Sequence, residues 1–496
     1  MKYFLGIDLG TQSMKGILYD PDGNLVAHAS QGYLPDFPKP NWCEQDVNAW
    51  IDALTNVISE VKKISGINSI DIGCIGLASQ CGGIVPISSD GVPLHKSLLW
   101  LDRRAEEQCD VITHQIDPDE VYELVGAPIS ASLAAAKIAW FRERMPEIYD
   151  KAMTFLQPGE FMVYYLTGEI VTDYSHAGIY GLLDSTTLTW SKHMCDLFGI
   201  DMEKLPKIRP AADVAGTLKP EVAEQLGLDR TTKVVVGGAD QSVASLGSGL
   251  ITPGDILNVM GTAEIIAGAS DHVDFDKIRL LRTHLHVIPG IWQIEQGALI
   301  SGAAVRWYKD NLARCGFDEI NAAAEKAPPG SNGLVFFSGL SGATSPLPHG
   351  YGRGIFFGLT MSHDFSHLSR SVFEGCAYGF RDSIESLEKM NMSSGEIIAS
   401  GGGINSRIWM QIKADMVGKR IKTLKNSDST PLGAAMLAGI AQGNFASYKE
   451  ACDKFIEFGD SYEPNPANKQ LYDDMYGFYR ELFFNSCKLF DRYREL

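Results

Sequence analysis

Apolar and polar positions at the start of the chain alternate in a way that predicts a β-hairpin with a tight polar turn. The run from Tyr3 to Ile7 has the composition of a strand, and Gly16 to Tyr19 resumes it. Between them lie a carboxylate, an amide, two hydroxyls and a lysine: Asp8, Gln12, Thr11, Ser13 and Lys15. Turn N–H groups, hydroxyls and a lysine can bind phosphate oxygens, and a carboxylate can hold a metal ion that neutralises them. An ordinary hairpin with a glycine-containing turn would show the same local pattern.

A similar hairpin recurs in the second half of the chain. Residues 255–266 again predict a strand, a turn at Gly261-Thr262 and a second strand. Two such hairpins half a chain apart predict a duplicated fold that grips one nucleotide from two sides. In this the chain resembles the actin, Hsp70 and sugar-kinase superfamily. The resemblance implies a duplicated α/β fold of the ribonuclease H-like kind, with two domains around a central cleft.

The segment Gly247 to Gly254 predicts a domain boundary, because its glycine, proline and serine residues separate two complete patterns of strands and helices. The expected domains are residues 1–248 and 249–496. A chain of 496 residues is also too long for one hydrophobic core.

Composition and charge exclude several classes of protein. The net charge of −18 offers no basic face for nucleic acid, and no stretch approaches the roughly 20 apolar residues of a membrane span. No secretory signal is visible, so a cytoplasmic location is expected. The nine cysteines are scattered without a C-x-x-C pair, which is typical of free thiols. His284 and His286 are spaced as alternate positions of a strand, and no cysteine or carboxylate nearby completes a zinc site.

Asp240 is the first candidate for catalysis. The apolar strand Val234 to Val236 leads through two glycines to Asp240, and a helix can begin at Gln241. In open α/β sheets ligands gather beyond the carboxyl ends of strands. A carboxylate there can accept a proton from a hydroxyl that attacks a γ-phosphate. A helix N-cap is the structural alternative for this aspartate.

A glycine-rich turn at residues 400–406 follows a predicted strand and precedes a helix. Three consecutive glycines, Gly401 to Gly403, would let a flat ligand such as adenine approach the backbone. The same turn could exist without a ligand. The chain has no Walker A motif, since Gly418-Lys419 lacks the upstream glycine and the following serine or threonine.

The most specific pattern lies between residues 354 and 374. Gly354-Ile355-Phe356-Phe357-Gly358-Leu359 is followed by His367-Leu368 and then by Ser371 to Glu374. This matches the C-terminal signature of the FGGY carbohydrate kinases at each defined position. The loop of Asp8 to Lys15, Trp100 to Arg104, Gly237 to Gln241, Gly261-Thr262, Ser301 to Ala303 and Gly401 to Gly403 occur in family order. The chain therefore resembles FGGY kinases over nearly its whole length, with the pattern of xylulose kinases nearest.

The resemblance implies an ATP- and Mg²⁺-dependent transferase. It makes Asp240 the catalytic base and Asp8 the residue that organises magnesium. The implied phosphate and adenosine contacts are Thr11, Gln12, Ser13, Lys15, Gly261, Thr262, Gly302, Gly402, Gly403 and Asn405. Sugar binding and the first phosphate loop would belong to the first domain and ATP binding to the second, and a homodimer is a possible assembly.

The expected partner is a small sugar or polyol, and the substrate-binding candidates are Gln80, Cys81, Gly82, Trp100, Asp102 and Gln241. Xylulose kinases carry Met-His-Gly and glycerol kinases an Arg-Glu pair where this chain has Gln80-Cys81-Gly82. The pair Asp240-Gln241, in contrast, is that of glycerol kinases. The small residues Ala134 to Ala136 leave room for a substrate larger than glycerol. A ketose such as D-xylulose is favoured, with glycerol, erythritol or gluconate as alternatives.

Proteins of two other kinds share parts of this pattern. An Hsp70-like or actin-like protein gated by nucleotide would have both phosphate hairpins, but it would not need Asp240 or the FGGY signature. A kinase-like module that binds sugar without phosphorylating it is disfavoured because Asp8 and Asp240 are both present.

Overall fold

The computed structural model describes residues 2–273, 281–426 and 428–493 of the chain. Within this part, each half builds a large mixed β-sheet. In the first sheet β1 (Tyr3–Leu9), β2 (Ser13–Tyr19) and β3 (Leu25–Gly32) form an antiparallel meander. β5 (Ile72–Ser79) runs parallel to β1, β14 (Lys233–Val235) parallel to β5, and β13 (Val214–Thr217) antiparallel to β14.

The second sheet repeats that pattern. β16 (Ile256–Met260), β17 (Ala263–Ser270) and β19 (Trp292–Ile300) form the meander, with β18 (Arg282–Leu285) beyond β19. β22 (Glu396–Ser400) and β23 (Arg420–Leu424) continue in parallel, and β24 (Phe458–Tyr462) closes the sheet antiparallel to β23. The repetition confirms the predicted duplicated α/β fold of two domains.

Helices cover both faces of the first sheet. α1 (Val47–Ser65) buries Trp50 and Val57 on one face, where the Val57 side chain lies over Gly16 of β2. α15 (Ser429–Gln442) lies on the other face, so close that a Cβ on Gly76 of β5 would stand 1.7 Å from the Ala434 carbonyl oxygen. A helix that follows the strands of the second half thus packs on the sheet of the first. The division of the chain at residue 248 stays a prediction.

α10 (Asp240–Gly247) and α15 cross in direct backbone contact. A Cβ on Gly247 would lie 2.0 Å from the Ser429 carbonyl oxygen, and one on Gly433 would lie 2.0 Å from the Val243 carbonyl oxygen. Only glycine permits this approach. Since α10 begins with Asp240, the crossing ties the position of that carboxylate to the start of α15.

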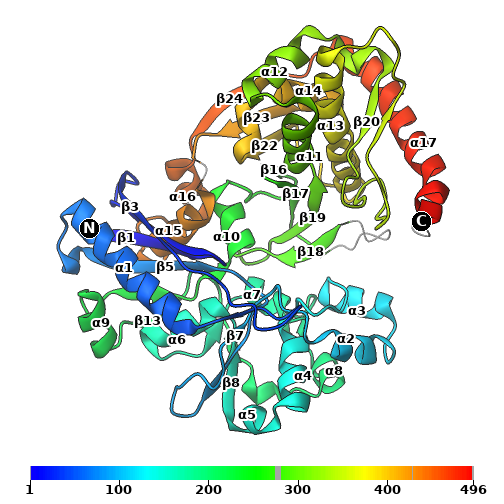
Figure 1. Cartoon of the computed structure of the whole chain (residues 1–496). Helices are drawn as coiled ribbons and strands as arrows, with labels where there is room; N and C mark the ends of the chain where they lie inside the picture. The colour runs from blue at the N-terminus through cyan, green and yellow to red at the C-terminus, as the bar shows by residue number, and fades with distance from the viewer. Residues whose placement is uncertain (1, 274–280, 427, 494–496) are drawn as a thin grey trace.

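A mainly helical region is inserted between β5 and β14. Its helices are α2 (Glu106–Thr113), α3 (Pro118–Val125), α4 (Ala134–Arg144), α5 (Pro146–Lys151), α6 (Pro158–Thr167), α7 (Tyr174–Ile179), α8 (Lys192–Phe198) and α9 (Pro220–Leu226). Short strand pairs accompany them: β4 (Glu44–Gln45) with β7 (Ser97–Leu98), β6 (Val85–Ser88) with β8 (Ala152–Leu156), β9 (Val171–Thr172) with β12 (Lys207–Ile208), and β10 (Leu183–Asp184) with β11 (Thr189–Trp190). In Figure 1 this region forms the lower part of the molecule.

The second sheet is contacted by α11 (Gly302–Trp307), α13 (Phe365–Lys389) and α14 (Arg407–Val417). α12 (Phe317–Lys326) packs on α13 and α14, α17 (Lys469–Tyr493) packs on α14, and α16 (Tyr448–Phe455) packs against α15. β20 (Val335–Phe337) pairs with β21 (Ile355–Phe357) beside α13 and α17. α11 is followed directly by a π-helical turn, Tyr308–Ala313. No helix in the described ranges is both long and apolar enough to span a bilayer.

Candidate functional site

The carboxyl ends of β1, β5 and β15 (Gly238–Ala239) meet at one edge of the first sheet. Asp8 of β1 lies opposite Ala78 of β5, and Ala239 lies opposite Ser79. Asp240 follows Ala239 directly as the first residue of α10, one residue earlier than the sequence predicts for the helix. The register therefore brings the predicted metal residue Asp8 and the predicted base Asp240 to the same edge.

These two carboxylates are partly buried and lie close to other acidic groups. Burial raises the pKa of Asp8 to about 7, and the charges of Asp240 and Asp428 act in the same direction, while Lys15 opposes them. Burial also raises the pKa of Asp240 to about 6, although the Gln241 N–H and His176 stabilise its charged form. A carboxylate with a pKa near the working pH is suited to accept a proton. A divalent cation between such groups would relieve their repulsion.

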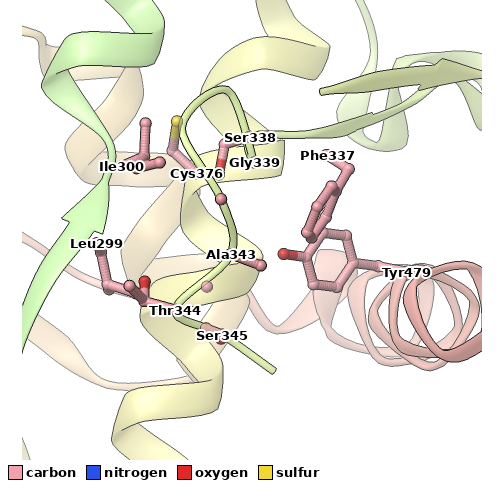
Figure 2. A pocket seen from close by; sticks show the side chains of 12 residues that line it. Leu299, Ile300, Phe337, Ser338, Gly339, Ala343, Thr344, Ser345, Cys376 and Tyr479 are labelled. Atoms are coloured by element: carbon pink, nitrogen blue, oxygen red, sulfur yellow. The ribbon is translucent and has the colours of Figure 1, made fainter. Parts of the chain in front are cut away.

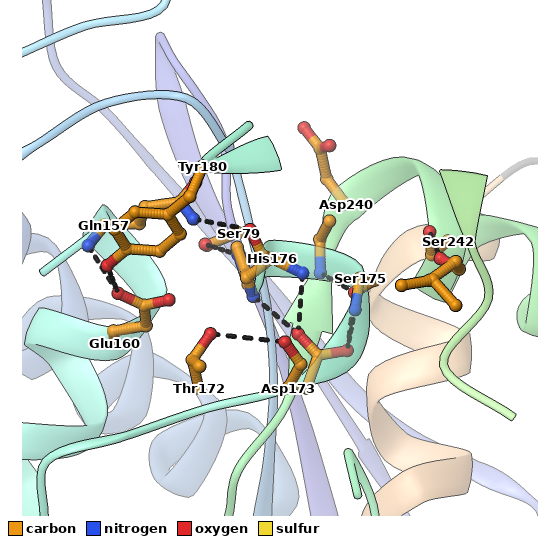
Figure 3. A network of polar contacts seen from close by, with 12 residues as sticks. Ser79, Gln157, Glu160, Thr172, Asp173, Ser175, His176, Tyr180, Asp240 and Ser242 are labelled. Carbon is orange, nitrogen blue, oxygen red and sulfur yellow. Dashed lines mark hydrogen bonds and ion pairs between the residues drawn. The ribbon is translucent and has the colours of Figure 1, made fainter. Parts of the chain in front are cut away.

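A buried polar network lies directly beneath Asp240 (Figure 3). The Ala239 N–H donates to Ser175 Oγ at 2.9 Å, and Ser175 Oγ donates to the Asp173 carboxylate at 2.6 Å. His176 Nδ1 lies 2.9 Å from the other Asp173 oxygen, and His176 Nε2 lies 3.0 Å from Ser79 Oγ. The network holds the residue before Asp240 against β5, and the Asp240 carboxylate points away from it.

The surroundings of His176 favour the protonated form of its imidazole. Burial lowers the pKa of His176, but its hydrogen bond to Asp173 and the charges of Asp173, Glu160 and Asp240 outweigh burial and raise it overall. Sequence reasoning missed Asp173 and His176. The local signal that could have indicated their contact is their separation of three residues, with Asp173 directly before α7 and His176 in its first turn.

The first phosphate hairpin is held from several sides. The Gly10 N–H donates to the Ser13 carbonyl at 3.0 Å, which closes the turn. The Gly10 carbonyl accepts from Tyr33 Oη at 2.6 Å, and Trp100 Nε1 donates to Thr11 Oγ1 at 3.1 Å. Gln12 is exposed at the tip of the turn. The predicted phosphate contacts Thr11, Gln12 and Ser13 thus stand on one supported loop.

Lys15 Nζ lies 2.9 Å from an oxygen of Asp428, the residue that precedes α15. The Asp428 N–H in turn donates to Asn426 Oδ1 at 2.9 Å. Sequence reasoning missed Asp428. Its local pattern is that of an ordinary helix start, and nothing in it indicates a contact with the first hairpin.

The predicted sugar-binding residues next to β5 are enclosed. Gln80 Nε2 donates to Gln45 Oε1 at 3.2 Å. The Gly82 N–H donates to Gln157 Oε1 at 2.7 Å, and Gly82 has φ of +72°, where any Cβ would also meet the Ser132 carbonyl oxygen at 2.5 Å. Only glycine fits that position.

Cys81 lies between them as a protonated thiol. Burial raises the pKa of Cys81 well above its ordinary value, and the charges of Asp240 and Glu295 add to the effect. A thiol of this kind reacts slowly, since the thiolate is the nucleophile.

The other predicted substrate contacts differ in exposure. Trp100 is 40 % exposed, and Gln241 is exposed at the start of α10. Asp102 is fully buried and accepts hydrogen bonds from the Cys43 N–H at 2.6 Å and from Arg104 Nε and Nη2. Its carboxylate is thus occupied within the protein, and its role as a substrate contact stays a prediction.

The predicted nucleotide residues of the second half gather at the carboxyl ends of β16 and β22. The Ala303 N–H donates to the Thr262 carbonyl at 2.9 Å, and a Cβ on Gly302 would lie 2.1 Å from the Gly261 carbonyl oxygen. Gly403 lies against the side chain of Met260, the last residue of β16, where an added Cβ would stand 2.6 Å from Met260 Cε. Gly402 and Asn405 belong to the same short turn, η5 (Gly402–Asn405). The hairpin, the start of α11 and the glycine-rich turn thus form one backbone-lined corner.

A small, partly open pocket lies elsewhere in the second half, between β19, the segment 337–345, α13 and α17 (Figure 2). Its volume of about 20 Å³ is enough for a single water molecule. None of the predicted site residues lines it. We interpret it as a packing gap in the core.

The described residues contain no group of three or more His, Cys, Asp or Glu side chains placed to hold a metal ion. Mg²⁺ needs less than that, because it binds through one or two carboxylates together with substrate phosphates and water. The partly buried carboxylate of Asp8 therefore fits magnesium as a ligand better than it fits a metal that requires a complete protein cage.

Comparison with known proteins decides the family. Residues 3–247 match the N-terminal domain of the FGGY family of carbohydrate kinases, and residues 256–442 match its C-terminal domain. The chain belongs to the FGGY family. It is therefore a carbohydrate kinase that uses ATP, which confirms the resemblance drawn from residues 354–374. The alternative of a nucleotide-gated interaction protein is excluded.

Relatives within the FGGY family carry two different names. The chain is 32 % identical to a xylulose kinase of Lactococcus lactis over 493 residues, which covers 99 % of this chain and 98 % of that one. It is 29 % identical to a gluconokinase of Bacillus subtilis over 501 residues, covering 99 % and 96 %. The crystal structure of a ligand-bound xylulose kinase from Lactobacillus acidophilus matches with a TM-score of 0.91 at 27 % identity, covering 99 % and 100 %. FGGY kinases of either name thus share its full length.

Proposed function

We propose that this kinase transfers the γ-phosphoryl group of ATP to a hydroxyl of a small sugar, with a ketose such as D-xylulose favoured. Asp240 accepts the proton of the attacking hydroxyl. Its position at the start of α10, next to Asp8 and above the Asp173–His176 network, is the observation that carries the proposal. The enzyme aligns the hydroxyl, the phosphate and the metal, which is most of what phosphoryl transfer needs.

Each predicted residue has one task in this scheme. Asp8 would hold Mg²⁺, which neutralises phosphate charge when bound. The loop of Thr11, Gln12, Ser13 and Lys15 binds phosphate from the first half, and Gly261, Thr262 and Gly302 bind it from the second. Gly402, Gly403 and Asn405 hold the adenosine. Gln80, Cys81, Gly82, Trp100, Asp102 and Gln241 stand on the sugar side.

A second candidate acceptor is a sugar acid or another polyol, such as gluconate, erythritol or glycerol. The gluconokinase relative favours gluconate, and the pair Asp240-Gln241 favours glycerol. The room expected beside Ala134 to Ala136 is taken up by core packing, since all three alanines are fully buried in a hydrophobic cluster. Glycerol remains disfavoured because a short triol leaves buried polar groups of the site unpaired. A homodimer, a cytoplasmic location and domains of 1–248 and 249–496 belong to the same proposal.

A coupled assay of ADP release across pentuloses, hexuloses, polyols and aldonates tests this function. We expect turnover with a five- or six-carbon acceptor and at least tenfold lower kcat/KM with glycerol, since one missing set of polar contacts costs about that much. The proposal would be contradicted if glycerol were the only acceptor turned over efficiently. It would also be contradicted if the enzyme turned over none of the acceptors in the panel.

A further inference from the structure

A strand of the second half packs against the first half beside Asp240. Ser242 Oγ of α10 donates to the Leu285 carbonyl of β18 at 3.0 Å. Just beyond β18, the Val287 side chain lies so close to Gly238 that a Cβ there would stand 2.4 Å from Val287 Cγ1. Figure 1 shows β18 at the edge of the second half, next to α7. The position of β18 is thus fixed relative to the residues on either side of Asp240.

One side of the β18–β19 pair carries a carboxylate held by two neighbours. Glu295 of β19 has one oxygen 3.3 Å from His284 Nε2, and its other oxygen accepts from Gln293 Nε2 at 2.9 Å. Burial raises the pKa of Glu295, but the combined effect of His284, Gln293 and Arg282 is larger and opposite. The pKa of Glu295 therefore lies below its usual range. Glu295 is therefore a carboxylate rather than a carboxylic acid.

Two side-chain acceptor oxygens, one on β19 and one directly after β5, are buried without partners in the described part of the chain. Gln293 Oε1 and Gln80 Oε1 make no hydrogen bond within the described ranges, although their residues are only 3 % and 2 % exposed. Among the described residues each Glu295 oxygen has one polar neighbour, His284 or Gln293, whereas a carboxylate oxygen can accept about two hydrogen bonds. Buried acceptors without partners are costly, so their presence points to a ligand that donates hydrogen bonds.

Glu295 also lies within electrostatic range of the predicted sugar site. Its negative charge contributes to the raised pKa of Asp240 and to that of Cys81, which follows Gln80. Glu295 comes from the second half, whereas Asp240 and Cys81 come from the first. One side of the acceptor site is thus formed by Glu295 of the second half rather than by residues of the first half.

We propose that Glu295, held by His284 and Gln293, forms the second-half wall of the acceptor site and accepts hydrogen bonds from hydroxyl groups of a neutral ketose or polyol. This deepens the proposed function and rests on its acceptor site. A fixed negative charge at this place disfavours an aldonate, because the substrate carboxylate would meet another carboxylate. Glu295 is thus a specificity-determining residue that selects neutral polyhydroxylated acceptors over sugar acids.

The test measures sugar binding directly as well as turnover. Calorimetry follows the binding of D-xylulose, erythritol, xylitol and gluconate to the full chain and to the Glu295→Gln variant, which keeps the shape and removes the charge. The control is Glu457→Gln, which changes an exposed residue before β24. Nucleotide binding, measured in the same way, shows that each variant is folded.

We expect at least one neutral acceptor to bind the unmodified enzyme and to bind Glu295→Gln about tenfold or more weakly, because hydrogen bonds to a charged group are strong. Glu457→Gln binds as the unmodified enzyme does. The KM for the sugar rises in Glu295→Gln, while the KM for ATP stays unchanged, and the preference for neutral acceptors over gluconate falls.

Equal sugar affinities of Glu295→Gln and the unmodified enzyme would overturn the inference, as would tighter binding of gluconate than of every neutral acceptor. Absence of binding by every sugar in the panel would also overturn it. If a neutral sugar binds through Glu295 but is not phosphorylated, the inference holds and the proposed function fails.

Discussion

Lys15 Nζ lies 2.9 Å from the Asp428 carboxylate, and this contact joins the first phosphate hairpin to the start of α15 across 413 residues of sequence. Both side chains are partly exposed, so the pair contributes little to stability. Its importance is electrostatic, since Asp428 competes for the lysine that is predicted to bind phosphate and also raises the pKa of Asp8.

Replacing Asp428 with asparagine is expected to tighten nucleotide binding in the absence of Mg²⁺. The variant removes one negative charge next to the hairpin and frees Lys15, which should lower the Kd for ADP about threefold to tenfold at low ionic strength. Calorimetry without metal measures this. Asp428→Glu keeps the charge and serves as the control. An unchanged or weaker affinity in Asp428→Asn would contradict the competition.

Asp8→Asn is expected to raise the magnesium concentration that gives half-maximal activity. Asp8 is the carboxylate of the first phosphate hairpin, and Mg²⁺ in nucleotide sites usually has one or two such ligands. Rates measured over a series of Mg²⁺ concentrations at saturating ATP test the expectation. If the magnesium profile of Asp8→Asn coincided with that of the unmodified enzyme, Asp8 would have only a structural role.

Activity should fall as the pH drops through about 6. The base must be ionised to accept a proton, and the pKa of Asp240 is raised to about 6, so protonation removes activity below that value. The pH profile of kcat/KM, measured with excess Mg²⁺, reports this pKa. A profile flat down to pH 4.5 would contradict the assignment.

His176→Asn should move the acidic limb of that profile to higher pH, by roughly half a unit or more. The charge of His176 lowers the pKa of Asp240, so its removal makes the base harder to ionise. His193→Asn, an exposed histidine on α8, is the matched control. An unshifted limb in His176→Asn would show that the network beneath Asp240 is only structural.

A buried ion pair supports the second phosphate hairpin. Lys413 of α14 pairs with Glu264 of β17, both fully buried, and donates to Asn258 Oδ1 of β16 at 3.2 Å. Lys413→Met leaves the Glu264 charge uncompensated and should lower the free energy of unfolding by about 3–5 kcal/mol. Urea unfolding followed by fluorescence measures it. The double variant with Glu264→Gln should recover much of the loss, and a loss of less than about 1 kcal/mol in Lys413→Met alone would contradict this role.

The sequence allowed the fold to be predicted where the signal was local. The two hairpins, the strand before Asp240 and the glycine-rich turn at 401–403 each depend on residues within one short segment, and each is an element of the structure. The packing of α15 on the first sheet could not be predicted from the sequence. It depends on close contacts of Gly6 and Gly76 with a helix that lies more than about 350 residues further along the chain.

The residues around the site that sequence reasoning missed belong to long-range contacts. Asp428 reaches Lys15 through the packing of α15, and the Asp173–His176 pair reaches Asp240 through Ser175 and Ala239. His284 showed only the alternation of a strand, and Glu295 gave no local signal. Their relation to the acceptor site exists only once β18 lies beside α10.

The most direct test of the account is the turnover of Asp240→Asn at saturating sugar and ATP, with ATP affinity measured separately. Asparagine keeps the shape of the side chain but cannot accept the proton, and the loss of a general base typically costs about 10²–10⁴-fold in rate. We predict a drop of that size in kcat with nearly unchanged ATP affinity. A drop smaller than about tenfold would contradict the assignment of Asp240 as the base and, with it, the proposed arrangement of the site.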